Sequence, residues 1–76
     1  MAHAYRWFSA YYTYFVESEK TTCINITTEQ SAFRKAREYS MVWGSADIYG
    51  RDWETDLPYL IARAKNGRVY RLKERV

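Results

Sequence analysis

The feature that most constrains the fold is residues 4–17, a run dominated by aromatic and β-branched side chains. Such side chains favour strands because they fit the pleated, half-buried surface of a sheet. Alternation places Tyr5, Trp7, Ser9, Tyr11, Thr13 and Phe15 on one face, and Arg6, Phe8, Ala10, Tyr12, Tyr14 and Val16 on the other. The run therefore predicts a long strand with one face in the core and an unusually apolar outer face. A bulge near Ser9-Ala10 would exchange the two faces partway along.

A second strand is predicted over residues 21–27, after a polar turn at residues 17–20. The short connection makes the two strands an antiparallel hairpin. Alternation places Thr22, Ile24 and Ile26 on the core side of the second strand, with Cys23, Asn25 and Thr27 facing away.

A helix is predicted next, between an N-cap at Thr27 and a left-handed terminating residue at Gly44. Gln30 stands three residues after Thr27, the spacing of a capping box. Helical spacing gathers an apolar face from Ala32, Phe33, Ala36, Tyr39, Ser40 and Trp43.

The remaining chain predicts a short strand at residues 46–49, a loop at 50–56, and two strands at 59–65 and 68–74 joined through Asn66-Gly67. A two-residue turn would pair Ala64 with Val69 and leave both faces mixed. A three-residue turn over residues 65–67 would pair Leu60 with Leu72 and Ala62 with Tyr70, which collects apolar residues on one face. We favour the second register, which sends Arg63, Arg71 and Lys73 to the opposite face.

The order strand-strand-helix-(short strand)-strand-strand predicts one α+β domain over residues 1–76. Two hairpins share an antiparallel sheet, and the helix packs on one face of it. Aromatic residues make up 18% of the chain, and we expect them to supply the core that so short a sequence needs.

Charge is distributed unevenly along the chain. The formal net charge is +3, but residues 44–58 sum to −3 and residues 59–76 to +5. Asymmetry of this kind bears on partners rather than on fold. Cys23 is the only cysteine, no apolar run is long enough to span a membrane, and the first residues lack the features of a signal peptide. We expect a cytoplasmic protein, monomeric or homodimeric, without a membrane partner.

The sequence predicts no catalytic, cofactor-binding or metal-binding site. His3 is the only histidine, Cys23 is expected to be an inert buried thiol, and there is no glycine-rich phosphate loop. Four carboxylates, Asp47, Asp52, Glu54 and Asp56, raise the alternative of a magnesium-dependent nuclease. Such an enzyme needs a strand-borne carboxylate pair and a lysine at defined spacing, so we interpret the group as a solvated acidic loop in a protein that is not an enzyme.

Two surfaces are candidates for partner binding. The first is the loop of Arg51, Asp52, Trp53, Glu54 and Asp56, where a tryptophan rimmed by charges suits an interface, unless Trp53 folds back over the core. The second is the open sheet face, carrying Tyr12, Tyr14, Arg63, Arg71 and Lys73. Aromatic residues interleaved with cations suit single-stranded nucleic acid or an acidic protein surface. The same face could instead be solvated or close on a second copy.

The helix end Tyr39-Ser40-Met41-Val42-Trp43-Gly44-Ser45-Ala46-Asp47, followed by the Asn66-Gly67 hairpin, resembles small bacteriophage-encoded anti-CRISPR proteins, especially type I inhibitors built as a sheet with one helix. The most specific part is Trp43-Gly44-Ser45. The resemblance implies a stoichiometric inhibitor that binds a bacterial immune effector complex in the host cytoplasm. Many such inhibitors are acidic DNA mimics, whereas this chain is net basic. A protein-binding inhibitor is therefore the leading hypothesis, with a small nucleic-acid-binding protein as the alternative.

Overall fold

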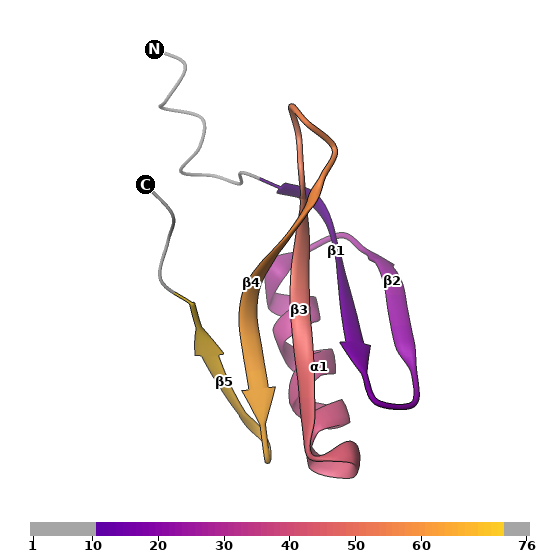
Figure 1. The fold of residues 1–76 in the computed structure, drawn as a ribbon, viewed down its shortest axis with the longest axis vertical. Helices are drawn as coiled ribbons and strands as arrows, with labels where there is room; N and C mark the ends of the chain where they lie inside the picture. Colours follow the sequence, from indigo (N-terminus) through magenta and orange to yellow (C-terminus); the bar gives the residue numbers. More distant parts are fainter. Residues whose placement is uncertain (1–10, 73–76) are drawn as a thin grey trace.

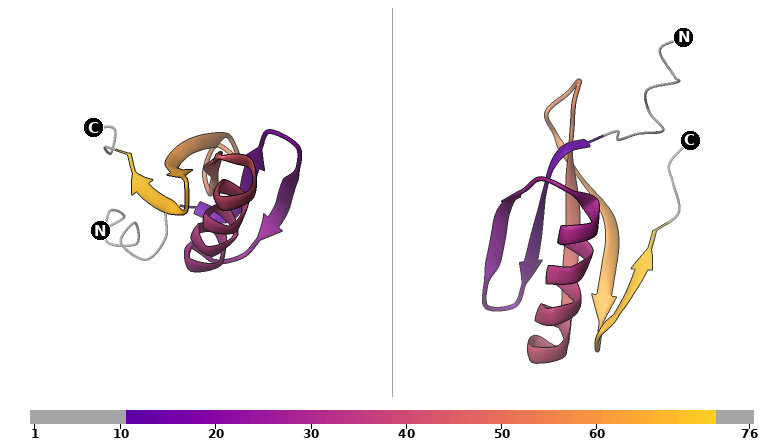
Figure 2. Two further views of the ribbon diagram at one scale, coloured as in Figure 1. Left: turned by 90° about the horizontal axis from the view of Figure 1, so that it is seen from below. Right: turned by 180° about the vertical axis from the view of Figure 1, so that it is seen from behind.

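The computed structural model describes residues 11–72, which form one antiparallel sheet of five strands crossed by a single helix (Figure 1). The elements are β1 (Tyr11–Ser18), β2 (Thr22–Ile26), α1 (Glu29–Trp43), β3 (Ser45–Asp52), β4 (Pro58–Lys65) and β5 (Arg68–Arg71). Their order across the sheet is β2-β1-β3-β4-β5. Figure 2 shows the two layers, with α1 on one side of the sheet. The predicted α+β class is confirmed, while the first strand before Tyr11 and the last strand after Leu72 lie outside the described residues.

The central strand of the sheet is β3, for which the sequence predicts only a short strand and a loop. It extends from Ser45 to Asp52 and pairs with both β1 and β4. Gly50 and Asp52 have poor strand propensity, but a strand between two partners gains ladder hydrogen bonds on both edges. Tertiary pairing therefore outweighs local preference over the second half of β3.

The core between helix and sheet is built mainly from small aliphatic side chains rather than from aromatic rings. Its buried apolar residues are Tyr14, Val16, Ile26, Ala32, Ala36, Ala46, Ile48, Ala62 and Ala64. Tyr14 is the only buried aromatic side chain among residues 11–72. Five alanines let α1 approach the sheet closely, which leaves little room for rings between the layers. Within residues 11–72 aromatic rings therefore supply only part of the core, because Tyr14 lies in it and Tyr11, Phe33 and Tyr39 pack partly buried against it.

A bulge in β2 overturns the predicted faces of that strand. Tyr14 pairs with Ile26 and Val16 with Cys23, so β2 contains one more residue than the matching part of β1. Asn25 takes up the extra residue with a left-handed φ of 60°. As a result Cys23 packs against the core beside Ile26, and Ile24 is 62% exposed.

The helix begins one residue later than predicted and ends where predicted. Thr28 is the N-cap, and its hydroxyl oxygen accepts a hydrogen bond from the Ser31 N–H at 3.1 Å. Gly44 follows the helix with φ 96° and donates its N–H to the Ser40 carbonyl at 2.9 Å. Within residues 11–72 no helix has the length and apolarity needed to cross a membrane.

The register of the β4–β5 hairpin is the one that the sequence argument rejected. Ala64 pairs with Val69 and Ala62 with Arg71. Asn66 and Gly67 both have positive φ, 49° and 88°, as a two-residue type I′ turn requires. The turn therefore sets the register, and it turns Arg71 toward α1 instead of the open sheet face.

Ser40 joins the helix to this hairpin. It is the only buried polar residue of the described chain, at 1% exposure. Its hydroxyl donates to the Arg37 carbonyl at 2.9 Å and accepts from the Gly67 N–H at 2.7 Å. The Asn66 N–H donates to the Gly44 carbonyl at 3.1 Å, so both turn residues are bonded to the end of α1.

Replacement of Ser40 by alanine should destabilise the protein by about 1–3 kcal/mol, because the Gly67 N–H would be left without its buried acceptor. Urea denaturation followed by circular dichroism measures the change. Ser31→Ala, at an exposed position in the first turn of the same helix, should change the stability by no more than about 0.5 kcal/mol. A cost for Ser40→Ala no greater than this control would contradict the role assigned to the hydroxyl.

Gly50→Ala should also destabilise the folded protein, because the Tyr11 ring lies over this glycine. A methyl group at Gly50 would stand 2.6 Å from Cγ of Tyr11, the ring atom nearest the backbone. Displacing the ring should cost about 1–3 kcal/mol in unfolding experiments. In a Tyr11→Ala background the same substitution should become neutral or stabilising, since alanine in a strand normally improves on glycine. Equal costs in the two backgrounds would show that the ring is not the obstacle.

Candidate functional site

The strongest candidate site is the end of the β3–β4 hairpin, which projects beyond the rest of the sheet (Figure 1). We define the hairpin tip as residues 51–57 together with Tyr12 of β1. All five predicted loop residues lie here: Arg51, Asp52, Trp53, Glu54 and Asp56. Tyr12, predicted for the open sheet face, joins them.

Hydrogen bonds hold the backbone of the tip in one conformation. The Asp52 carboxylate oxygen Oδ1 accepts the N–H groups of Glu54 at 2.6 Å and Thr55 at 3.2 Å. The Asp52 N–H donates to the Leu57 carbonyl at 3.0 Å, and the Asp56 N–H donates to the Asp52 carbonyl at 2.9 Å. Short polar side chains bonded to their own turn are what ordered reversals commonly use.

Two residues next to the loop fasten Asp56, which has a left-handed φ of 60°. Nη1 of Arg51 donates to the Asp56 carbonyl at 2.7 Å. The Tyr12 hydroxyl donates to the Asp56 carboxylate. Tyr12 reaches the loop because it is the extra residue of a β1 bulge, between the pairs Tyr11–Asp52 and Thr13–Arg51.

Trp53 does not fold back over the core. It is 65% exposed, and its ring stacks obliquely on Tyr12 with centroids 5.2 Å apart. Leu57, which the sequence argument missed, is 54% exposed in the same loop. Its position directly before Pro58 was the available signal, because the chain there reads as a loop rather than as part of a core strand. The tip thus presents apolar side chains on an ordered backbone.

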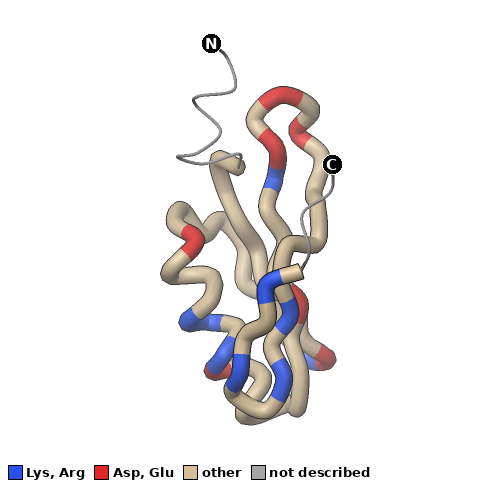
Figure 3. Tube along the Cα trace, turned by 90° about the vertical axis from the view of Figure 1, so that its left-hand side faces the viewer, with Lys and Arg blue, Asp and Glu red and all other residues tan. Residues whose placement is uncertain are grey.

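The tip is acidic. Asp52, Glu54 and Asp56 stand against the single cation Arg51, and Figure 3 shows these acidic positions at one end of the molecule, away from most lysines and arginines. The hydrogen bond to Asp56 is the main cause that raises the pKa of the Tyr12 phenol above its usual value of 10.0. Ionisation would place two negative oxygens against each other.

The other predicted binding residues are not brought together. Tyr14 is 5% exposed and lies in the core, on the same face of β1 as the buried Val16. Arg71 also lies on the helix side, paired with Glu29 and 5.1 Å from the centre of the Phe33 ring. Arg63 does lie on the open sheet face, where Nε is 3.2 Å from the Asp47 carboxylate. Lys73 lies outside the described residues.

The open sheet face carries a pair of rings that the sequence argument did not select. Phe15 and Tyr49 are cross-strand partners and stack with centroids 4.8 Å apart and planes 9° from parallel. Burial is the main cause that raises the pKa of the Tyr49 phenol, with Asp47 and Glu17 adding to it. The rings are half-buried and bordered by carboxylates, which makes this face a poor surface for phosphates.

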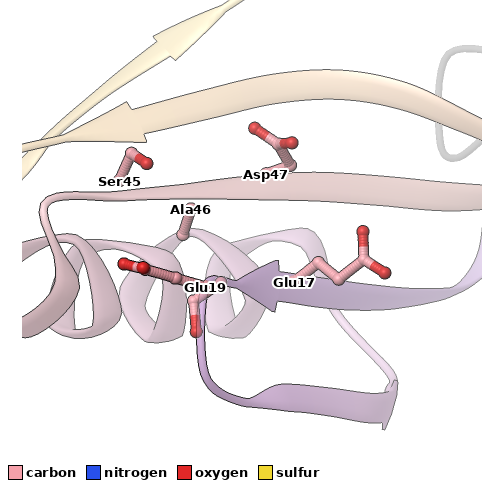
Figure 4. A pocket seen from close by; sticks show the side chains of 6 residues that line it. Glu17, Glu19, Ser45, Ala46 and Asp47 are labelled. Atoms are coloured by element: carbon pink, nitrogen blue, oxygen red, sulfur yellow. The ribbon is translucent and has the colours of Figure 1, made fainter.

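The carboxylates predicted as one cluster are separated in the structure. Asp47 lies on the outer face near the start of β3, and Asp52 ends the strand about 16 Å away at the usual rise per residue. Asp47 instead faces Glu17 across the β1–β3 ladder. Figure 4 shows these two carboxylates with Glu19 around a shallow polar pocket. Within residues 11–72 no three His, Cys, Asp or Glu side chains are arranged so that they could hold a metal ion.

Comparison of the chain with protein-family models, curated proteins and solved structures found no match.

Removal of the Tyr12 hydroxyl should loosen the tip without unfolding the protein. In Tyr12→Phe the amides of residues 53–57 should exchange hydrogen faster, because Asp56 loses a side-chain bond, while the amides of β3 and α1 keep their protection. Tyr70→Phe, at another exposed tyrosine, is the control and should leave exchange at the tip unchanged. Unaltered exchange at the tip in Tyr12→Phe would contradict the role given to this bond.

The hydrogen bond between Tyr12 and Asp56 also predicts that order in the tip depends on pH. The raised pKa of Tyr12 means that the folded tip favours the protonated phenol. Order in the tip should therefore be intact below about pH 10 and lost as the pH rises through the raised pKa. Exchange measured in the wild type and in Tyr12→Phe should converge at that pH.

Proposed function

We propose that the protein is a non-catalytic binding module that inserts the hairpin tip into a pocket of a protein partner. The observation that carries the proposal is the 65% exposure of Trp53 on a loop held by its own hydrogen bonds. Buried tryptophans dominate the energy of many protein interfaces. A loop that is already ordered loses little conformational freedom on binding, which favours affinity.

The chemistry of the tip defines the partner surface. Trp53, Leu57 and Tyr12 would fill an apolar hollow, and the three carboxylates around them require a basic rim. Glu54 follows Trp53 in the loop and adds to the negative charge beside the indole.

The narrower proposal is a phage-encoded inhibitor of a bacterial CRISPR-type effector complex. Its support is the resemblance carried by Trp43-Gly44-Ser45. This run also has a structural role, because Gly44 ends α1 with a positive φ and Ser45 begins β3. The resemblance therefore adds a candidate partner, whereas the proposed mode of binding depends only on the tip.

Affinity capture from lysate of a bacterium with an active CRISPR system tests both the binding module and its proposed partner. Wild-type bait should retain a protein partner. Trp53→Ala should lower the amount of partner recovered by at least about tenfold, a typical loss for a central aromatic side chain. Val42→Ala is the matched control, since Val42 is 68% exposed but lies on α1. Equal recovery by Trp53→Ala and Val42→Ala, or recovery of nucleic acid without protein, would refute the proposal.

The inhibitor hypothesis has its own readout. Expression of the protein in a CRISPR-immune host should raise the plaquing efficiency of a targeted phage, and Trp53→Ala should remove this effect. A partner captured through Trp53 without any change in plaquing would leave the binding module in place and exclude the immune effector.

A further inference from the structure

We propose that the open face of the sheet, the face turned away from α1, packs against the same face of a second copy of this chain. Figure 2 shows α1 on one side of the sheet only. In the three central strands Val16, Ile48 and Ala62 are buried toward the helix, and alternation turns their neighbours outward. The dimer therefore has four layers, with the two sheets inside and the two helices outside.

One row of outward side chains crosses four strands and changes its charge on the way. Glu17 of β1 pairs with Asp47 of β3. The row continues with Arg63 of β4 and Tyr70 of β5. Glu19 adds a third carboxylate on the β1–β3 side, around the shallow pocket of Figure 4. The open face is therefore acidic on the β1–β3 side, whereas its β4–β5 side carries a cation and a phenol hydroxyl.

Two more cations on the β4–β5 side have no carboxylate partner. Lys65 and Arg68 are exposed and stand directly opposite each other beside the turn. Among the described residues neither takes part in an ion pair, whereas Arg63 is paired with Asp47. Like charges that face each other across a ladder repel. A carboxylate supplied by another molecule would relieve this repulsion, and the acidic side of the same face carries such groups.

An apolar row lies between these charges and the hairpin tip. Phe15 and Tyr49 stack on each other, and Leu60 is the partner of Tyr49 in β4. All three side chains are half-buried. Beyond them the Arg51 guanidinium is 6.0 Å from the centre of the Phe15 ring. An apolar centre between polar margins is the usual composition of a protein interface.

The positions of these groups fit a twofold axis that runs along the strands between β3 and β4. Rotation about this axis keeps each row at its level and exchanges β3 with β4 and β1 with β5. Asp47 then meets Arg63 of the second copy, and Tyr49 meets its Leu60. Aligned sheets pack about 10 Å apart, so side chains from the two faces touch.

The same rotation gives Arg68 a carboxylate. Arg68 is level with the start of β3, because it pairs with Lys65 and Lys65 pairs with Ser45. Glu19 follows β1 at this end of the sheet, since Ser18 pairs with Ala46. Exchange of β1 with β5 therefore places Arg68 beside Glu19 of the second copy. The charge that has no partner in one copy is compensated in the dimer.

The distribution of charge favours a second copy over other occupants of the face. Phosphates of a nucleic acid would meet Glu17, Glu19 and Asp47, which repel them. A partner of one charge would match one side of the face and repel the other. A second copy related by the twofold axis matches both sides at once.

Sedimentation velocity over protein concentrations of about 5–500 µM tests the proposal in the range of weak complexes. The three rows cover only part of the sheet, so the interface is small and the dimer should be reversible. Wild-type protein should change from monomer to dimer as its concentration rises. Arg68→Glu should weaken the dimer at least about tenfold, because it places two carboxylates together.

An exchange of charges tests the contact itself. Glu19→Arg should weaken the dimer as Arg68→Glu does, and the double variant should return to within about threefold of the wild type. Glu19→Arg lies at an exposed turn and tests the same contact if Arg68→Glu does not fold. Arg34→Glu is the matched control, because Arg34 is exposed on α1 and the change in net charge is the same. It should weaken the dimer less than about twofold.

Three results would overturn the proposal. The first is a wild type that stays monomeric over the whole range of concentration. The second is an equal loss in Arg34→Glu and Arg68→Glu, which would mean that only net charge matters. The third is a double variant no stronger than Glu19→Arg alone, which would show that the two residues do not meet.

The dimer does not depend on the hairpin tip, and Trp53→Ala should dimerise as the wild type does. Loss of the dimer in Trp53→Ala would move the interface to the tip and refute the contact between sheet faces. A monomeric wild type that still captures a partner through Trp53 would refute the dimer alone. Because the axis runs along the strands, both tips lie at one end of the dimer. If the proposed function holds, they can bind two sites of one partner.

Discussion

Close packing of α1 on the sheet is the constraint on which the rest of the structure depends. Alanines on both layers bring the helix near the strands, and Ser40 bonds the helix end to the β4–β5 turn. A core of this kind has little volume and excludes large rings. Most aromatic side chains of the described chain must therefore be partly exposed, and the molecule has apolar surface available for partners.

The same packing separates the charges. The short β4–β5 hairpin is bonded to the end of α1, and its turn cations Lys65 and Arg68 share the sheet face that points away from the helix. The longer β3–β4 hairpin extends away from the helix and carries the carboxylates and Trp53 at its tip. The carboxylates and the exposed apolar side chains are therefore presented together, at the end of β3 opposite to the β4–β5 turn.

Sequence reasoning was most reliable where local chemistry acts alone. The residues from Arg51 to Asp56 lie together at one end of the molecule with Trp53 exposed, as the charged residues around the tryptophan indicated. Tyr12 and Tyr14 were assigned to one face, but a one-residue bulge at Tyr12 separates them. Arg71 was misplaced because a change of turn reverses every face beyond it. The bulges at Tyr12 and Asn25 have no clear mark in the sequence, because both residues also occur in regular strands.

The sequence by itself determined the element types, the helix stop at Gly44 and the antiparallel sheet with one helix, since these follow from side-chain periodicity and backbone preferences within a few residues. It also contained the sharpest clue to the last hairpin, because Asn-Gly favours the two-residue turn whatever the pattern of its faces. Only the tertiary structure decided that β3 is the central strand, that Tyr12 supports the tip and that Ser40 bonds the β4–β5 turn. These three features depend on pairing between distant segments, which is governed by how closely the helix fits the sheet and not by any neighbouring residue.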